Sequence, residues 1–335
     1  MSEREGSTMT LECLAGIADG GAVSGSVVGE CQTVLVAVSC VAAAERLMEV
    51  VALVAADRRV RAVFTVVPGA DGTRCRRAAE FLRARGCVVL PWTRVSRREF
   101  DLVLADGSRE RLRGRALCYP DGSEWVLVGE PGAEVATVVG DIGYDRFLAS
   151  IPFRAGYRRG FGVSGARKLV VATSSTVDVV VGLAARLVAA LPSARYRVAA
   201  VLGADVWCAY GDWQVRTWFA DCLRAGVLLV SPTEGWRAAL VAADVVVGDV
   251  GPVTRYATAV GLPVLEGPPS NERSLPDQID RAMRGNPADP VMVRPGRAAE
   301  NLRSVMCRLL GITEPNHLVS CPPVPPAEFV DGPSW

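Results

Sequence analysis

Short, uninterrupted runs of apolar residues alternate with longer amphipathic segments along most of this chain, and this alternation limits the fold more than any other feature. In the first half the apolar runs are residues 33–38, 62–67, 87–90, 102–105 and 135–139, and the helical segments are 42–56 and an arginine-rich stretch through Leu82. In the second half the apolar runs are 169–172, 196–202, 227–230, 245–248 and 263–265, separated by helical segments at 178–191, 212–225, 236–243 and 253–260.

Apolar runs without alternating polar residues are typical of parallel strands that are covered by helices on both faces. The chain is therefore predicted to have an α/β fold with two tandem Rossmann-like, doubly wound parallel-sheet domains that face each other across a cleft. We expect a flexible N-terminal segment at 1–30, a first domain at 31–150, a second domain at 151–312 and a Pro-rich tail at 313–335. The tail contains Pro322-Pro323-Val324-Pro325-Pro326, for which packing on the protein, disorder and an SH3-type ligand are the three interpretations.

Charge and composition exclude several classes of function. The chain has 37 Lys plus Arg against 36 Asp plus Glu, and this balance gives no field for non-specific binding of nucleic acid. Lys168 is the only lysine, and we interpret the excess of arginine as the coding bias of a GC-rich genome. The only histidine is His317, in the tail, so no site with two histidine ligands can form and no metal cofactor is expected.

The cysteines and the hydropathy pattern indicate the compartment. The ten cysteines form no C-x-x-C pair, and several lie within apolar runs, where a reduced cysteine behaves as a small apolar residue. No hydrophobic signal segment follows Met1, and no run of about 18 apolar residues occurs. We therefore expect a cytoplasmic protein without a transmembrane segment.

One glycine motif is in the wrong place for a dinucleotide site. Gly160-Phe161-Gly162-Val163-Ser164-Gly165 matches G-x-G-x-x-G, but it precedes a predicted strand instead of following one, so we interpret it as a turn.

The segment Thr173-Ser174-Ser175-Thr176 is better placed for a binding site, because it lies between a strand and a helix, where Ser174 and Ser175 could hold a phosphate. N-capping of the helix explains these hydroxyl residues equally well.

The stretch of residues 245–254 is the most informative in the chain. An apolar run ends at Asp249, Gly251 permits close approach of the backbone, and Thr254 falls in the first turn of the next helix. This geometry suits a diphosphate at a helix N-terminus, and it equally suits an ordinary turn between a strand and a helix.

Further candidates lie after neighbouring strands. Glu234 and Gly235 follow the run at 227–230, where the acid could accept ribose hydroxyls or cap a helix. Trp207 is expected in a loop after a strand, where its ring could stack on a base. The chain lacks the G-x-S-x-G, G-K-[ST] and D-x-D motifs, so P-loop and α/β-hydrolase functions have no support.

The segments 243–249 and 261–265, together with 201–207, 211–218 and 234–240, resemble the GT-B transferases. The likeness covers about residues 31–270 and is greatest to the actinobacterial branch of proteins like the CDP-glycerol glycerophosphotransferases. It implies an acceptor-side first domain and a second domain that holds a CDP- or UDP-linked donor without a bound metal. Asp249, Gly251 and Thr254 would then face the donor diphosphate, with Ser174 and Ser175 at the neighbouring loop.

The chain departs from this family at positions where the family carries histidine. Gly203-Ala204 stands in place of His-Pro, Val250 in place of a second histidine, and Asp121 in place of the histidine of a Pro-His-Gly loop. Two hypotheses remain open. The first is an active transferase that uses Asp121 as its catalytic base. The second is an inactive pseudo-transferase that binds or scaffolds a protein partner, or forms a homo-oligomer.

Overall fold

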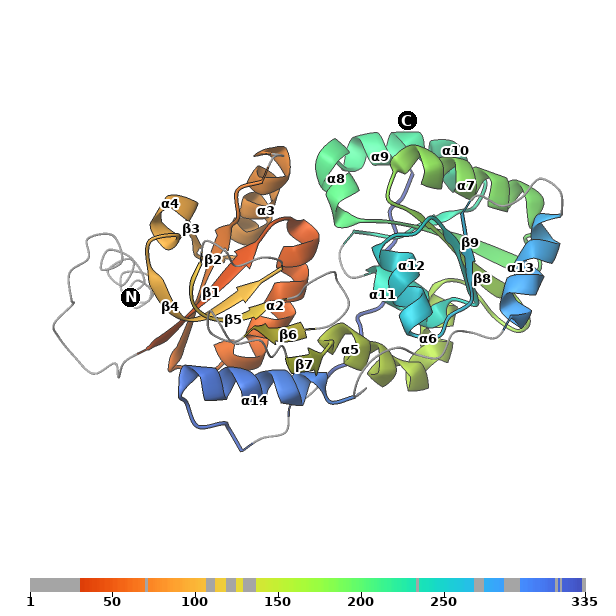
Figure 1. The fold of residues 1–335 in the computed structure, drawn as a ribbon. Coiled ribbons are helices and arrows are strands. Elements are labelled where there is room, and N and C mark those ends of the chain that lie inside the picture. The colour runs from red at the N-terminus through yellow and green to blue at the C-terminus, as the bar shows by residue number, and fades with distance from the viewer. Residues whose placement is uncertain are drawn as a thin grey trace, which may run out of the picture. The chain divides into compact units, whose positions relative to one another are not determined.

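The computed structural model describes residues 31–69, 72–106, 112–118, 125–128, 137–232, 235–267, 274–285, 296–316, 319 and 321–332 (Figure 1). These residues form two separate β-sheets with helices packed against them. The predicted flexible segment at 1–30 lies outside the described residues. Within the part of the chain that is described, no helix combines the length and the apolar character that a bilayer crossing requires.

The first sheet has the strand order β3-β2-β1-β4-β5-β6-β7. Its strands are β1 (Gln32–Val38), β2 (Val60–Val66), β3 (Val89–Leu90), β4 (Glu99–Ala105), β5 (Arg113–Cys118), β6 (Trp125–Val128) and β7 (Thr137–Gly140). The pairings among β1 to β5 are parallel, whereas β6 and β7 pair antiparallel to their neighbours. The predicted parallel sheet is thus extended by an antiparallel edge, because the link between β5 and β6 is too short for the crossover that a parallel pairing needs.

Apolar side chains on both faces of β1 explain its continuous run of hydrophobic residues. Val34, Val36 and Val38 belong to a core beneath the helices α2 (Val41–Ala55) and α3 (Gly72–Ala84). Leu35 and Ala37 point to the opposite face, where they join a second core with the short helix α4 (Trp92–Val95). Successive residues of a strand point to opposite faces, so a strand in the middle of a covered sheet must be apolar throughout.

The second sheet is entirely parallel, in the order β10-β9-β8-β11-β12. Its strands are β8 (Lys168–Ser174), β9 (Tyr196–Leu202), β10 (Leu228–Leu229), β11 (Val245–Gly248) and β12 (Val264–Glu266). Its helices are α6 (Arg154–Gly160), α7 (Val177–Ala190), α8 (Ala204–Tyr210), α9 (Asp212–Trp218), α10 (Ala220–Arg224), α11 (Gly235–Ala242), α12 (Pro252–Ala259) and α13 (Leu275–Arg284). The two predicted Rossmann-like sheets are confirmed.

Two details of the second sheet differ from the sequence prediction. The single helix expected at 212–225 is two short helices, α9 and α10, which meet at the buried Phe219. The segment 204–210, expected as a loop, is the helix α8. Gly160 ends α6, and the rest of the glycine motif, residues 161–165, lies as predicted in a turn before β8, where Gly162 and Gly165 have φ angles of 65° and 57°.

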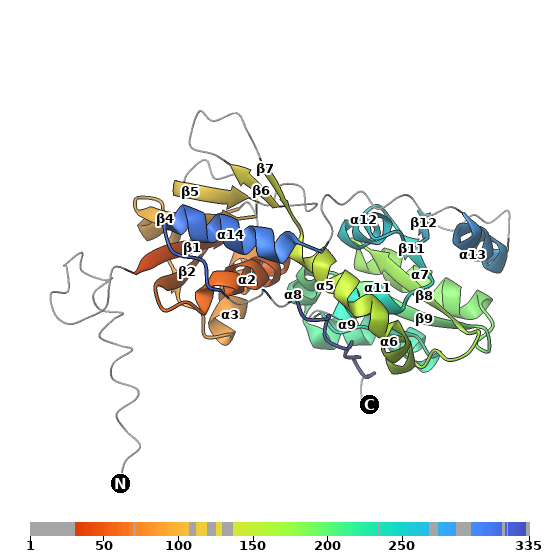
Figure 2. The same ribbon diagram turned by 90° about the horizontal axis from the view of Figure 1, so that it is seen from below.

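Helix α14 (Ala298–Leu310) follows the second sheet in sequence but packs on the first one (Figures 1 and 2). Its buried side chains Leu302, Met306 and Leu310 join the same core as α2. Residues 298–310 fall inside the range that the sequence assigned to the second domain. Their helical period gives them an apolar face, and the sequence pattern alone does not say which sheet that face covers.

The start of α14 is held by a buried carboxylate from a distant part of the chain. Asp145 lies on α5 (Ile142–Ser150) and accepts hydrogen bonds from the backbone N–H groups of Gly296 (2.7 Å) and Ala299 (3.2 Å). Burial raises the pKa of Asp145, and the hydrogen bonds from Ala299 and Gly296 oppose that shift. The carboxylate satisfies N–H groups that a helix start leaves without partners and carries a charge that favours the positive end of the helix dipole.

Replacing Asp145 with alanine should lower the free energy of unfolding by about 1–3 kcal/mol, because buried N–H groups lose their acceptor. Urea unfolding followed by circular dichroism measures the change. Glu300→Ala is the matched control, since Glu300 lies in the first turn of the same helix but is exposed, and among the described residues it pairs with Arg297 alone. Equal stability of the two variants would contradict the capping role of Asp145.

A buried ion pair links helices that belong to different sheets. Glu49 on α2 accepts hydrogen bonds from both terminal nitrogens of Arg237 on α11, at 2.7 and 3.2 Å. Arg146 on α5 donates to the same carboxylate. A carboxylate held by two arginines in a buried setting is costly to break, because removal of one partner leaves an uncompensated charge.

The described part of the Pro-rich tail is extended and packs on the protein. Phe329 forms an antiparallel bridge with Val230, which lies just after β10, an edge strand of the second sheet. The centroids of the Phe329 and Phe161 rings are 5.0 Å apart. The Tyr157 hydroxyl donates to the Val324 carbonyl, and the Val324 N–H donates to Ser150 Oγ at 2.9 Å. The tail therefore covers an edge whose backbone groups would otherwise be open to pairing with another chain.

Val324→Ala should lower the free energy of unfolding by about 1–2 kcal/mol, because Val324 is almost fully buried and the change removes two methyl groups from the core. Thermal or urea unfolding of the purified variant tests this. The control is Glu328→Ala, at an exposed side chain of the same tail. A loss for Val324→Ala no larger than for the control would show that the tail contributes no packing energy.

Candidate functional site

The strand order of the second sheet creates a switch point between β8 and β11. The chain proceeds from β8 outward to β9 and β10, then returns to the other side of β8 to form β11 and β12. Connections at such a point leave in opposite directions, and doubly wound sheets bind their ligands beyond the carboxyl ends of the two central strands. β8 ends at Ser174 and β11 ends at Gly248, which puts the predicted phosphate-binding segments at this point.

Three of the predicted site residues make direct hydrogen bonds here. The hydroxyl groups of Ser174 and Ser175 donate to Asp249 Oδ2 at 2.8 and 3.0 Å. The backbone N–H of Ser175 points to both oxygens of the same carboxylate, at 3.2 and 3.3 Å. We call Ser174, Ser175 and Asp249 the switch-point cluster. Its donors face an anion, and in this structure the anion is the chain's own carboxylate.

Thr254 and Gly251 complete the turn that carries Asp249. Thr254 Oγ1 accepts from the Gly251 N–H at 2.8 Å, and its hydroxyl lies 2.8 Å from the Asp249 carbonyl oxygen and 3.0 Å from that of Gly251. Thr254 caps the start of α12 through the backbone N–H of the N-cap residue Gly251, and its side chain is buried. Thr254 thus holds the shape of the loop, whereas Asp249 presents the charge.

Gly248 allows β11 to approach β8 closely at the switch point. A Cβ atom at this position would lie 2.0 Å from the Thr173 carbonyl oxygen, well inside van der Waals contact. Only glycine therefore permits the register in which Gly248 pairs with Thr173 and places Asp249 beside Ser174.

Gly248→Ala should lower the free energy of unfolding by at least about 2 kcal/mol, because the added methyl group collides with a backbone atom that cannot move independently. Gly182→Ala is the matched control. Gly182 lies within α7, and a Cβ atom added there would meet no atom within 4 Å, so alanine should stabilise the helix by about 0.5–1 kcal/mol. Chemical denaturation measures the change in the free energy of unfolding for both variants, which should be opposite in sign. An unchanged free energy of unfolding for Gly248→Ala would refute the close approach of β11 to β8.

The other predicted residues are placed elsewhere or lie outside the described residues. Trp207 is not in a loop: it lies on α8, is 4% exposed and packs in the core of the second sheet, so its ring is not available to stack on a base. Gly235 begins α11, and a Cβ there would come within 2.7 Å of Val230 Cγ1. Close packing near the tail therefore accounts for this glycine. Glu234 and Asp121 lie outside the described residues.

The first sheet repeats the arrangement at its own switch point, and the sequence pattern had not led us to expect it. Ser39 follows β1, and Asp106 follows β4. The backbone N–H of Ser39 donates to Asp106 Oδ2 at 3.1 Å, and the Ser39 hydroxyl donates to the same atom. The sequence did carry a signal for this second cluster. In each domain a serine follows the first strand and an aspartate follows the fourth strand.

The neighbouring thiol is a poor nucleophile. Cys40 caps α2, accepting from the Ala43 N–H at 3.4 Å. Burial raises the pKa of the Cys40 thiol, and the negative charges of Asp205 and Asp106 raise it further. Because the thiolate is the reactive form, Cys40 is inert at neutral pH.

Among the described residues, no group of three or more His, Cys, Asp or Glu side chains is arranged to hold a metal ion.

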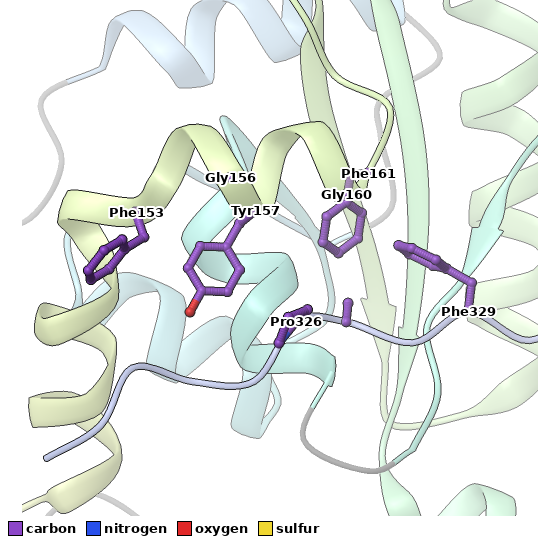
Figure 3. A pocket seen from close by; sticks show the side chains of 8 residues that line it. Phe153, Gly156, Tyr157, Gly160, Phe161, Pro326 and Phe329 are labelled. Carbon is purple, nitrogen blue, oxygen red and sulfur yellow. The ribbon is translucent and has the colours of Figure 1, made fainter.

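An apolar hollow of about 270 Å³ lies away from both switch points, between α6 and the tail (Figure 3). The rings of Phe153, Tyr157, Phe161 and Phe329 line it together with Pro326. Its lining, within the part of the chain that the structure describes, contains no charged side chain and none of the predicted site residues.

Comparison with solved structures shows that the fold is of the GT-B type, with two Rossmann-like domains in tandem. UDP-GlcNAc 2-epimerase from Neisseria meningitidis superimposes with a TM-score of 0.51 at 11% identity, over 83% of this chain and 100% of that one. A putative UDP-N-acetylglucosamine 2-epimerase from Listeria monocytogenes has a TM-score of 0.46 at 12% identity, over 87% of this chain and 100% of that one. The wall teichoic acid polymerase TagF has a TM-score of 0.47 at 9% identity, over 84% and 89% of the two chains. No protein-family model and no curated protein sequence matches this chain.

Proposed function

We propose that this chain is a GT-B-type protein that binds a nucleotide-diphosphate-linked small molecule at the switch-point cluster. The observation that carries the proposal is the convergence of two serine hydroxyls and a backbone N–H on one anion at the carboxyl edge of the second sheet. Doubly wound sheets bind ligands at this position. The epimerase from Neisseria meningitidis, which shares the fold, is described as bound to UDP-GlcNAc.

The donors of the cluster suit a phosphate group. Hydroxyl and amide donors next to a helix N-terminus favour an anion, and α7 begins at Val177, directly after the two serines. The Asp249 carboxylate now accepts those donors, so a phosphate oxygen would take the place that the carboxylate holds. Two unit charges about 4 Å apart repel by about 1–4 kcal/mol in a partly solvated site. Asp249 must therefore turn away when the diphosphate binds, and it weakens that binding.

Group transfer requires a base, and the candidate that the comparison with the family pattern supplies is Asp121. Where related transferases carry histidine, this chain has Asp121, Gly203 and Val250, and its only histidine is His317. A carboxylate can take a proton from an acceptor hydroxyl if it lies within hydrogen-bond reach. Under this proposal Asp121 is the catalytic base, the switch-point cluster holds the donor and no metal takes part.

A second candidate function is binding without turnover. The observation that favours it is Asp249 itself, which satisfies the phosphate-directed donors from within the chain. A protein of this kind would keep the fold and act as a binding or scaffolding partner of another protein or of a second copy of itself.

The binding proposal predicts opposite effects for the two parts of the cluster. Ser174→Ala combined with Ser175→Ala should weaken UDP or CDP binding at least tenfold, because about 1.5–3 kcal/mol is lost for each hydrogen bond to a charged group. Asp249→Ser should tighten the binding at least tenfold, because it removes a competing negative charge. Isothermal titration calorimetry at fixed ionic strength gives both constants.

Asp106→Ser is the matched control, since Asp106 makes the same contact at the switch point of the first sheet. Equal affinities for the wild type and all the variants would refute the site. Turnover is measured separately by incubating the wild type with UDP- and CDP-linked donors and following nucleotide release. Release that is lost in Asp121→Asn supports the transferase, and binding without release supports the second candidate.

A further inference from the structure

A polar hollow of about 390 Å³ lies at the opposite end of β8 from the switch-point cluster. Arg167, Lys168 and Arg195 line it, together with Tyr196 and Asp280. β8 begins at Lys168 and ends at Ser174, so the two places are about 20 Å apart along the strand. The hollow and the cluster are therefore separate sites.

The strand register brings the basic residues together. Lys168 pairs with Tyr196 across β8 and β9, and its N–H donates to the Arg195 carbonyl oxygen at 2.7 Å. Arg167 is held by bonds from Nε to the Tyr196 carbonyl and from NH1 to the Gly162 carbonyl, both at 3.2 Å. Backbone contacts thus fix the three positive residues on adjacent strand ends.

The positive charges of the hollow exceed the carboxylates within reach. Asp280 accepts a hydrogen bond from the Tyr196 hydroxyl at 3.1 Å. Lys168 Nζ lies 3.8 Å from Asp244, but that carboxylate already binds Arg158 at 2.7 Å. Among the described residues, neither Arg167 nor Arg195 forms an ion pair with a carboxylate; the Arg195 guanidinium lies 5.4 Å from the Tyr196 ring centre.

Structural roles account for some basic residues at this edge and not for others. Arg154 and Arg158 donate to the Ala242 carbonyl at the end of α11, where a positive side chain stabilises the helix. Lys168 and Arg195 are exposed and hold no such carbonyl. Nearby, burial and the charge of Arg167 lower the pKa of Arg197, whose Nε atom is buried and has no hydrogen-bond partner among the described residues. The charges of Arg167 and Arg195, which pair with no described carboxylate, add to that of Lys168; such like charges repel one another and are relieved by an anion.

We propose that Arg167, Lys168 and Arg195 form a second binding site, for a small phosphate-bearing anion, at the amino-terminal edge of the second sheet. The concave shape and the volume of the hollow suit a small molecule, and two arginines and a lysine, the side chains that bind phosphate, line it together. The whole chain has a net charge of only +1, which does not favour a nucleic acid as the occupant. This proposal does not depend on the function proposed for the switch-point cluster.

The test is a titration of the full chain with inorganic pyrophosphate in low salt. Binding to the wild type should weaken at least tenfold in the double variant Lys168→Ala, Arg195→Ala. Arg97→Ala with Arg98→Ala is the matched control, because it removes the same charge from two exposed positions after α4 and should leave the affinity unchanged. Ser174→Ala with Ser175→Ala removes any pyrophosphate binding at the switch-point cluster and should leave the binding that depends on Lys168 and Arg195, which separates the two sites.

The single lysine supplies an independent readout. Lys168 carries the only side-chain amine of the chain, so mass spectrometry can follow its acetylation without overlap from other lysines. Saturating pyrophosphate should slow acetylation of Lys168 at least fivefold, while that of the N-terminal amine stays constant. The proposal is overturned if pyrophosphate does not bind, or if the Lys168 double variant binds it as well as the control variant does. It is also overturned if pyrophosphate does not protect Lys168 from acetylation, or if a short RNA binds in preference to pyrophosphate.

Discussion

The parallel pairing of β11 with β8 is the constraint on which the second sheet and its candidate site depend. The two strands are about 75 residues apart in the chain, and Gly248 lets them approach so closely that any side chain there would strike the Thr173 carbonyl. This contact fixes the switch point, and it brings Asp249 within hydrogen-bond distance of Ser174 and Ser175. Without it, neither the sheet order nor the cluster would form.

The same carboxylate that organises the cluster also restricts what the cluster can do. Ser174 and Ser175 offer donors of the kind that hold phosphate, and Asp249 uses them within the chain. The pair Ser39 and Asp106 repeats this chemistry in the first sheet. An aspartate after the strand on the far side of each switch point thus gives the serine donors an acceptor within the chain.

Long-range contacts near the end of the chain complete both sheets. α14 adds its apolar face to the core of the first sheet and is capped by Asp145, which lies about 150 residues earlier. The tail then pairs at the edge of the second sheet, where Val324 is buried. Both contacts cover surface that the preceding elements leave open, so each sheet is completed by a segment far from it in sequence.

Much of this architecture could be predicted because it follows from local patterns. Continuous apolar runs predict central parallel strands, and the serine and aspartate segments after them were placed correctly at the sheet edge. Trp207 was misplaced because a short helix between glycines has no clear period, and its burial depends on the packing of α8 over the second sheet. β7 falls on the predicted run at 135–139, but the antiparallel edge that it forms with β6 was not predicted, because short strands carry little pattern.

The sequence by itself determined the class of fold, the number of sheets and the residue types that stand at the strand ends, because hydrophobic period and turn chemistry act over a few residues. Only the tertiary structure decided that Asp249 binds its own serine donors, that α14 covers the first sheet and that Lys168 stands beside Arg167 and Arg195. These outcomes depend on strand register and on packing between distant segments, which hydrophobic patterning leaves open.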